Sequence, residues 1–577
     1  MEFTPPTDEQ VFALKVSAGI DELGQTERYA AASEDLVAAV VAGIGTFAAQ
    51  EWAPLNRIGD IEGARLEYGR VVLPNGFAEA YRAYVEAGWN GIAAPEDFGG
   101  QGLPFSLAVC AMENLGSANL AFSLMPMLTV GAIEALIHHG SDQQRATYLA
   151  KLVSGEWSGT MNLTEPQAGS DVGALRTTAT PITDGPDAGK YRISGTKIFI
   201  TWGEHELTEN IVHMLLARTP GAPEGSRGIS LFIVPKFHVQ PDGTPGERND
   251  LKVISLEHKL GIHASPTCVM SYGDEGECIG ELVGRENEGL RAMFTMMNHA
   301  RINVGAQGIQ IAERALQQAT AYASERIQSA RAGTTDRTPV AIIEHPDVRR
   351  MLLRMRALTE GARALLYYAC GQIDRGGEDE AAQERADLLV PLVKAWCTDI
   401  GVEVASLDIQ VHGGMGFIEE TGAAQFLRDA RIAPIYEGTN GIQAADFVLR
   451  KLGAGDGAAL FSLLSEIEHD AEACAPLRAL CEDCGQVAEW MVHDASVDDR
   501  LSGSVPFLTM CATAVAGWQM LRQMRAAPTA PGKVATTKPV SARFFLEHIV
   551  PEARGHKASA MAGAGILYEL DAQTLAG

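Results

Sequence analysis

The sequence predicts an α+β protein, mainly α, in which a β domain lies between helical domains. Three observations lead to this fold class. Apolar residues recur at helical spacing before about residue 155 and after about residue 287, whereas short alternating or β-branched runs fill the part between. At 577 residues the chain exceeds one ordinary domain. A glycine-rich stretch, Gly453–Gly457, has the composition of a linker to a further helical region.

Residues 1–158 are expected to form an N-terminal α-helical domain. Gly140 can end one apolar helix, and Ser141 with Gln144 makes a capping box that begins the next helix. Proline and paired glycines in residues 94–100 fit no helix interior, so this stretch is predicted to be a loop.

Residues 159–284 are expected to form the middle β domain, a barrel or sandwich. Apolar and β-branched runs alternate with Gly, Pro and Asp, as is typical of short strands joined by turns. The predicted strands lie near residues 191–195, 198–201, 211–216, 228–234, 253–256 and 267–272.

Residues 285–452 are expected to form a helical bundle of the four-helix type. It begins with a long helix over about 289–328, which carries apolar residues mostly three or four positions apart, and continues with helices over 345–370 and 378–411. Residues 453–577 are expected to form an additional helical domain.

Charge and composition exclude several classes of protein. A net charge of -27 argues against nucleic acid, whose affinity comes mainly from cationic contacts to phosphate. The first residues of the chain resemble neither a signal peptide nor a transit peptide, and no apolar stretch of bilayer length is expected. Nine scattered cysteines fit a reducing compartment, so we expect a cytoplasmic protein. Its C-terminal tail is mixed in charge and broken by prolines, unlike a membrane anchor.

No metal site is expected. Cys481 and Cys484 have a metal-like spacing, but no second pair lies nearby and both fall in a helical pattern.

The run from Gln410 to Gln443 holds the main candidate for catalysis. A glycine turn near its start lets backbone amides approach a planar or anionic ligand. Near its end, Glu437 follows an apolar flank, where burial would raise the pKa of its carboxyl toward working pH and make it a candidate base. Taken alone, the same pattern also fits a helix-ending turn and a solvated glutamate.

Three stretches far apart in the chain favour the catalytic interpretation of Glu437 over that of a solvated glutamate. They read T-E-P-Q-A-G-S-D (164–171), K-I-F-I-T (197–201) and Q-V-H-G-G-M-G…Y-E-G-T (410–439). In this order and at these distances they resemble the acyl-CoA dehydrogenase family, over about residues 35–451. The additional C-terminal region is similar to the branch that contains 3-methylmercaptopropionyl-CoA dehydrogenases.

The resemblance implies that Glu437 removes the α-proton of an acyl-CoA thioester while the β-hydrogen leaves as hydride to flavin N5. In the family, the backbone N–H of this glutamate and a flavin ribityl hydroxyl stabilise the developing enolate oxygen. Gly438 would keep the backbone slim beside the thioester. Some relatives carry the base one residue before the helix arginine, Arg301, but here that position is Ala300.

The resemblance also implies binding residues. Expected FAD contacts are Met161, Leu163, Thr164, Gly169, Ser170, Phe199, Thr201, Arg326, Gln328, Gln410, Gly413, Gly414 and Thr439. Expected substrate contacts are Ser170, Asn298, Arg301 and Gly438. In the family, the glycine turn and the arginine matched by Arg326 serve a neighbouring subunit. Ser329 stands where the family usually has phenylalanine, and the loop to His345 is longer than usual, so the adenine-side contacts depart from the pattern.

The expected function is therefore that of an FAD-dependent acyl-CoA dehydrogenase, which forms a trans-2-enoyl-CoA in a β-oxidation type of reaction. Electron-transferring flavoprotein would reoxidise it, and a homodimer or a dimer of dimers is expected. Two alternatives stay open, an acyl-CoA oxidase that uses O₂ and a non-catalytic acyl-CoA-binding flavin scaffold. The acyl group is not determined by the sequence; 3-(methylthio)propanoyl and short or medium straight chains are of comparable size.

Overall fold

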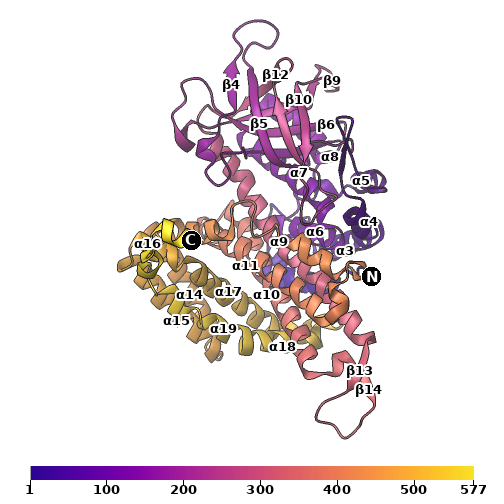
Figure 1. Cartoon of the computed structure of the whole chain (residues 1–577), viewed down its shortest axis with the longest axis vertical. Helices are drawn as coiled ribbons and strands as arrows, with labels where there is room; N and C mark the ends of the chain where they lie inside the picture. Colours follow the sequence, from indigo (N-terminus) through magenta and orange to yellow (C-terminus); the bar gives the residue numbers. More distant parts are fainter. Residues whose placement is uncertain (1) are drawn as a thin grey trace.

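The computed structural model describes residues 2–577 and places a β domain at one end of a larger helical body (Figure 1). Ser141 and Gln144 form the predicted capping box, and Gly140 ends the preceding helix in an extended conformation. The main N-terminal helices are α1 (Thr7–Ala13), α3 (Glu34–Phe47), α4 (Leu55–Glu62), α5 (Phe77–Glu86), α6 (Phe105–Ala118), α7 (Leu120–His139) and α8 (Asp142–Ser154).

A short hairpin interrupts these helices where only helix was expected. Strands β1 (Arg65–Glu67) and β2 (Arg70–Val72) pair antiparallel. Val71 is buried in the hydrophobic core of the β domain, and Leu66 packs against that core. The hairpin therefore owes its form to a contact with residues far along the chain, which local periodicity does not report.

The expectation of no apolar stretch of bilayer length was wrong. Two helical segments, Leu120–His139 and Ser504–Thr529, are long and apolar enough to cross a membrane by length and composition. In each of them 83% of the apolar window is buried inside the fold. Their apolar character is thus used for packing, as in helices that are buried on all sides.

The middle domain is built on an eight-stranded sheet with the order β10-β11-β5-β12-β7-β6-β3, to which β4 adds by pairing with β5. Only β3 and β6 pair in parallel; the other neighbours are antiparallel. Its strands are β3 (Trp157–Asn162), β4 (Thr178–Pro181), β5 (Tyr191–Thr201), β6 (Asn210–Ala217), β7 (Ser230–Pro235), β10 (Leu251–Leu256), β11 (Thr267–Tyr272) and β12 (Cys278–Val283). The two segments predicted at 191–195 and 198–201 form a single strand, β5.

Three long helices form the centre of the body: α9 (Gly289–Glu325), α10 (Pro346–Gly376) and α11 (Glu380–His412). Helices α9 and α11 cross in direct backbone contact. A Cβ added to Gly308 would lie 1.9 Å from the carbonyl oxygen of Cys397, so only glycine fits there. After α9, the β13 (Ile327–Ala330) and β14 (Pro339–Ala341) hairpin projects away from the body (Figure 1).

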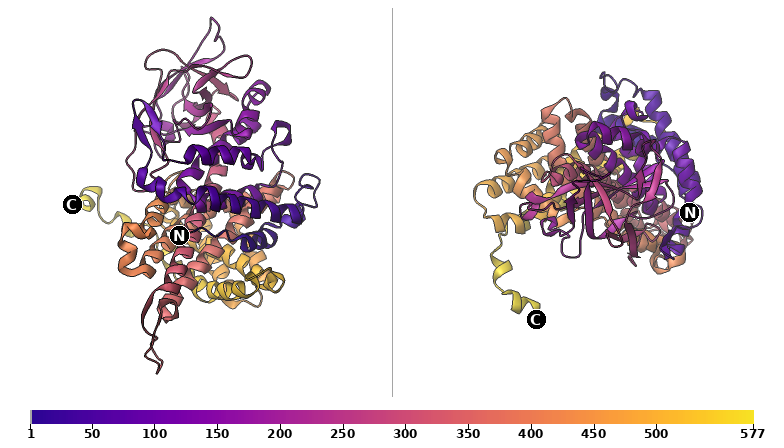
Figure 2. Two further views of the ribbon diagram at one scale, coloured as in Figure 1. Left: turned by 90° about the vertical axis from the view of Figure 1, so that its right-hand side faces the viewer. Right: turned by 90° about the horizontal axis from the view of Figure 1, so that it is seen from above.

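The C-terminal region is helical, as expected, and shares one continuous hydrophobic core with the N-terminal helices and the central bundle. Gly453–Gly457 is followed by α14 (Ala458–Asp470), α15 (Ala475–His493), α17 (Ser504–Ala526) and α18 (Val534–Phe544). The last residues extend away from the body (Figure 2). Cys481 and Cys484 are buried in α15, and no group of His, Cys, Asp or Glu in residues 2–577 is arranged to hold a metal ion.

Candidate active site

The loop that carries Glu437 joins α12 (Ala423–Ala430) to α13 (Asn440–Asp446). Glu437 and Gly438 have φ angles of 55° and 84°, so two successive residues adopt the left-handed conformation. This conformation is unfavourable for a glutamate and persists only where surrounding contacts hold it. Thr439 caps α13 by accepting a hydrogen bond from the Ile442 N–H at 3.2 Å.

Burial raises the pKa of the Glu437 carboxyl, while Arg301 and then Lys394 act in the opposite direction; the net shift is upward. The residue nevertheless keeps some solvent-accessible surface. A group that protein surrounds closely but that water still reaches lies in a recess. This environment suits a general base, whose pKa should lie near the working pH.

Two charged groups from different helices thus act on this carboxyl. Arg301 of α9 is only 9% exposed, and its Nε has no hydrogen-bond partner within residues 2–577. A buried guanidinium with an unused donor can receive an additional acceptor. Asn298, one turn earlier, is exposed, and Ala300 places a methyl group where some relatives carry their base.

A chain of contacts links the loop to the β domain. The Tyr436 hydroxyl donates to Gln307 Oε1 on α9, and Gln307 Nε2 donates to Met127 Sδ on α7 at 3.4 Å. At the start of α7, the Ala121 carbonyl accepts from Trp202 Nε1 at 3.2 Å. Trp202 directly follows β5, so contacts through α9 and α7 connect this strand to the base loop.

The first two motif stretches lie side by side. The Ile198 N–H donates to the Thr164 carbonyl at 2.9 Å, and Thr160 Oγ1 donates to the Thr201 carbonyl at 2.8 Å. Lys197 of one stretch and Glu165 of the other also form a buried ion pair of 2.8 Å. The sequence prediction that these stretches share one site is therefore consistent with the geometry.

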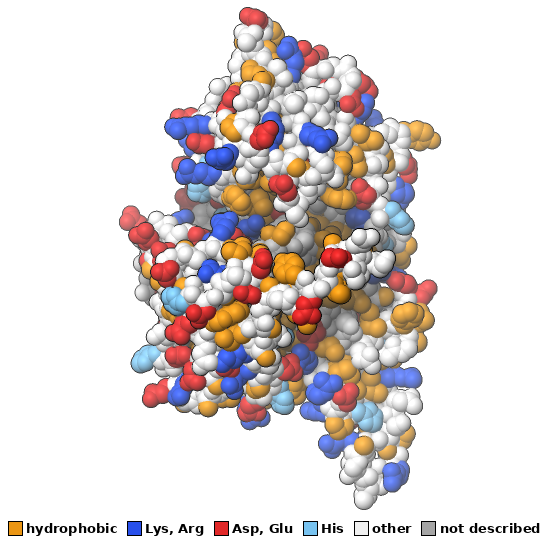
Figure 3. Space-filling view, turned by 60° about the vertical axis from the view of Figure 1, so that its left-hand side comes forward, with side chains coloured by type: hydrophobic (Ala, Val, Ile, Leu, Met, Phe, Trp, Pro, Cys, Tyr) orange, Lys and Arg blue, Asp and Glu red, His pale blue; other side chains and the backbone are white. Residues whose placement is uncertain are grey.

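Phe199 has the surface expected of a wall for a planar ring. It is 56% exposed and its φ is 60°, although its neighbours in the strand are half-buried (Ile198) and buried (Ile200). Gly169 and Ser170 are exposed as well, whereas Met161 is buried and Leu163 is half-buried. Figure 3 shows a hollow between the β domain and the helical body in which hydrophobic side chains are exposed. The exposed ring of Phe199, next to exposed backbone with small side chains at Gly169 and Ser170, offers a surface against which a flat isoalloxazine ring system can pack.

The remaining predicted FAD residues lie elsewhere. His412, next to the glycine turn, stacks on Tyr322 near the end of α9, with ring centroids 4.2 Å apart. Arg326 caps the same end and its Nη2 donates to Gln328 Oε1 at 3.3 Å. Since Arg326 follows Arg301 by 25 helical residues, the two lie about 37 Å apart along α9. Within one chain the glycine turn therefore does not complete the site of Phe199 and Glu437.

The sequence analysis did not find two residues beside the base. Lys394 is fully buried on α11 and Asn440 begins α13, and they are joined by a hydrogen bond of 2.9 Å. The available signal was a single lysine inside the apolar helical stretch L-V-P-L-V-K-A-W-C, since an unpaired lysine is rarely buried.

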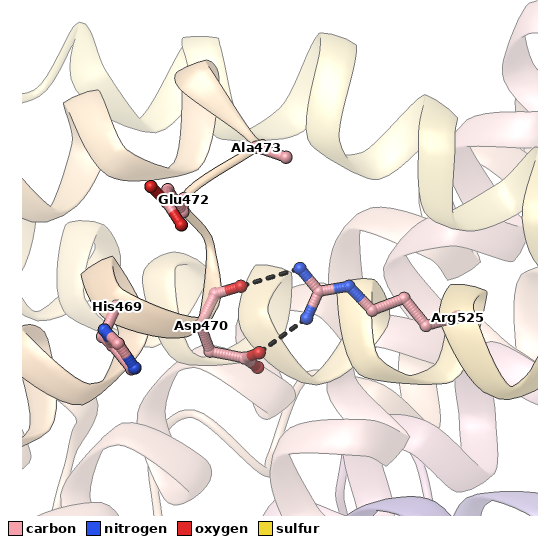
Figure 4. A pocket seen from close by; sticks show the side chains of 5 residues that line it. All are labelled: His469, Asp470, Glu472, Ala473 and Arg525. Carbon is pink, nitrogen blue, oxygen red and sulfur yellow. Dashed lines mark hydrogen bonds and ion pairs between the residues drawn. The ribbon is translucent and has the colours of Figure 1, made fainter.

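A separate hollow of about 400 Å³ lies in the C-terminal region, lined by His469, Asp470, Glu472, Ala473 and Arg525 (Figure 4). Its arginine is already used: Nη1 and Nη2 donate to the side chain and the carbonyl of Asp470 at 2.6 and 2.7 Å. These bonds close the end of α14 against α17, so the hollow is a by-product of a helix-end contact.

Comparison with known families defines the class. Four models match in succession: the N-terminal domain of acyl-CoA dehydrogenases (residues 38–156), their middle domain (160–274), their C-terminal domain (287–452) and an acetyl-CoA dehydrogenase C-terminal-like domain (461–571). The chain belongs to the acyl-CoA dehydrogenase family of flavoprotein oxidoreductases. The predicted fold class and enzyme class are confirmed.

Within the family, the chain is 49% identical over 538 residues to 3-methylmercaptopropionyl-CoA dehydrogenase of Ruegeria pomeroyi, covering 90% of each chain. It is 34% identical to a broad-specificity linear acyl-CoA dehydrogenase of Mycobacterium tuberculosis, covering 83% and 84%. An acyl-CoA dehydrogenase of Bacillus anthracis, solved in complex with FAD, shares the fold with a TM-score of 0.73 at 20% identity, covering 94% and 90%. The predicted cofactor, FAD, is that of the family.

Proposed function

We propose that Glu437 is the base of an acyl-CoA desaturation. One observation carries the proposal: a glutamate held in a left-handed turn inside a recess, with a raised pKa, between the positive charges of Arg301 and Lys394. Such a carboxylate can take the α-proton of a thioester, and no carboxylate replaces it at position 300. The N–H of Glu437 and the slim Gly438 are the proposed contacts to the thioester oxygen.

FAD, when bound, accepts the β-hydrogen as hydride. Phe199, with Thr201 and Leu163, Thr164, Gly169 and Ser170, would hold its ring system from the β-domain side. Thr439 would contact it from the base loop, and Met161 would support the first stretch from beneath, being buried. Arg301 and Asn298, on one face of α9, together with Ser170, are proposed to bind the CoA part of the substrate.

Gln410, Gly413, Gly414, Arg326 and Gln328 are proposed to bind the adenosine half of FAD in a neighbouring subunit. Their distance from Arg301 along α9, about 37 Å, supports a site shared between two chains. A homodimer, or a dimer of dimers, is therefore proposed. Electron-transferring flavoprotein is the proposed oxidant and the cytoplasm the proposed location.

For the acyl group we propose 3-(methylthio)propanoyl. The support is the 49% identity, over nine-tenths of both chains, to an enzyme named for that substrate. A butyryl-CoA dehydrogenase of Syntrophomonas wolfei, 39% identical over 412 residues, makes butanoyl the second candidate. A pocket for one group should admit the other with a modest penalty per methylene.

Anaerobic bleaching of the flavin tests the proposal, with a panel from butanoyl- to palmitoyl-CoA that includes 3-(methylthio)propanoyl- and 3-phenylpropanoyl-CoA. We expect the fastest bleaching with 3-(methylthio)propanoyl-CoA and progressively slower bleaching as the straight chain lengthens. Absence of bleaching with every thioester would favour the non-catalytic scaffold. Stoichiometric peroxide during turnover in air would favour the oxidase.

A further inference from the structure

We propose that Lys394 is a positioning residue for the reaction: its buried ammonium, bonded to Asn440, holds the Glu437 turn against α11 and stabilises the carboxylate form of the base. This inference rests on the proposed role of Glu437. Lys394 is named by none of the family motifs considered above, and it lies on a helix 43 residues before the base.

The hydrogen bonds of Asn440 fix the base loop to α11. Its Oδ1 accepts from Lys394 Nζ at 2.9 Å, and its Nδ2 donates to the Ala395 carbonyl at 3.0 Å and to Asp399 Oδ1 at 2.8 Å. Its backbone N–H donates to the Pro434 carbonyl at 3.0 Å, which closes the loop on itself. The turn that holds Glu437 is therefore bounded on its C-terminal side by a residue that α11 holds at three points.

A second side chain holds the turn from within α13. Gln443 Nε2 donates to the carbonyls of Glu437 and Gly438, both at 3.4 Å. With these carbonyls engaged, the left-handed conformation of both residues is stabilised and the N–H of Glu437 keeps one orientation. This N–H is the proposed donor to the thioester oxygen, so the same contacts align base and donor.

Few acidic groups act on the charge of Lys394. Lys394 is fully buried, and within residues 2–577 the carboxylates that act on it are Glu437 and Asp399. Asp399 already accepts from Asn440, and burial raises its pKa. A buried ammonium with no direct ion pair is costly unless it serves nearby charges. Lys394 lies beside a base that must be ionised to act, and stabilisation of that ionised form offsets the cost of burying the ammonium.

Other charged groups around the site act mainly on Arg301. Asp446 and Glu437 raise the pKa of its guanidinium and Arg450 lowers it, against a larger lowering by burial. Arg301 in turn lowers the pKa of Lys394, which burial brings down to about 8. Tyr436 faces Glu437 from the loop itself, and burial keeps its hydroxyl protonated. Among the described residues, Arg301 is then the cation that still acts on the Glu437 carboxyl once the lysine charge is removed.

The test is a titration of the Glu437 carboxyl in the holoenzyme by infrared difference spectroscopy, with the band assigned by subtraction of Glu437→Gln. Lys394→Gln keeps a donor toward Asn440 and removes the charge; Lys394→Arg keeps the charge. We expect the midpoint to rise by about one pH unit in Lys394→Gln, because at an effective dielectric near 20 a unit charge about 10 Å from a carboxyl shifts its pKa by about one unit. In Lys394→Arg it should stay within a few tenths of the wild type.

An unchanged midpoint in Lys394→Gln overturns the inference. Should that variant not fold, Lys394→Met removes the charge with an apolar side chain that suits the buried position, and it must raise the midpoint as well; an unchanged value there overturns the inference equally. The titration needs no turnover, so it decides the role of Lys394 even if no thioester bleaches the flavin, the result that would defeat the proposed function.

Discussion

Gly308→Ala tests how the crossing of α9 and α11 supports the site. The added Cβ would lie 1.9 Å from the Cys397 carbonyl oxygen, against 3.4 Å or more for an ordinary contact, so the helices must separate by about 1.5 Å. Overpacking of this kind costs about 1–3 kcal/mol, here at the upper end because the obstacle is backbone. Alanine regains about 1 kcal/mol of helix propensity. The net destabilisation is then about 2 kcal/mol.

The separation also displaces the two cationic groups that act on the base. Arg301 lies seven residues before Gly308 on α9, and Lys394 lies three residues before Cys397 on α11. We therefore expect a Tm lower by a few degrees together with a slower rate of flavin bleaching. Thermal melts followed by flavin fluorescence give the first value, and anaerobic stopped-flow gives the second.

Gly485→Ala is the matched control, since a Cβ there meets nothing within 4 Å in α15. It should leave the bleaching rate unchanged and the Tm equal or slightly higher. If Gly308→Ala behaves like this control, the close crossing does not position the site and the reasoning is refuted.

Three further predictions concern the cofactor site and the β domain. Phe199→Ala should weaken FAD binding about tenfold, whereas Phe199→Tyr should not, as measured by ultrafiltration of the holoenzyme; equal retention would contradict the stacking role. Mixed Arg326→Ala and Glu437→Gln chains, each inactive alone, should regain about a quarter of wild-type activity after random exchange into dimers, because one of two sites in each mixed dimer is intact; no recovery would contradict the shared site. Burial alone would raise the pKa of Glu165, but Lys197 and hydrogen bonds lower it to about 2, so its stabilising effect is present above about pH 4.5 and is lost as the pH falls toward 2. Lys197→Met should destabilise the β domain by about 3–5 kcal/mol at pH 7, because it leaves the buried Glu165 carboxylate without its partner. This loss should shrink as the pH falls and Glu165 is protonated, as measured by urea unfolding followed by circular dichroism at pH 7 and pH 4; an equal loss at both pH values would contradict this.

The sequence predicted the long helices, the strands and the capping box at Ser141, because periodicity and caps are local properties. It did not predict the β1–β2 hairpin, whose Val71 packs on residues more than a hundred positions away. It also missed the apolar length of α7, because Ser123, Thr129 and Glu134 interrupt its apolar residues.

The candidate site was predicted to a similar extent. Glu437 and Phe199 stand in recognisable motifs, and the structure gives each a setting that suits the role proposed for it. Lys394 and Gln307 lie on helices far from those motifs in sequence. Their approach to the base depends on how α9 and α11 cross, and a single sequence carries no side-chain positions. Residues that the fold brings to the base from distant parts of the sequence are therefore the part of the site that only the structure reveals.

The most direct test of the central claim is anaerobic stopped-flow of Glu437→Gln with 3-(methylthio)propanoyl-CoA. The variant should stay yellow, bind the thioester as shown by a shift of the flavin spectrum, and bleach at a rate about 10²–10⁴-fold below wild type, the contribution of general-base catalysis, since position 300 holds alanine and not a carboxylate. Bleaching at the wild-type rate would contradict the assignment of Glu437 as the base.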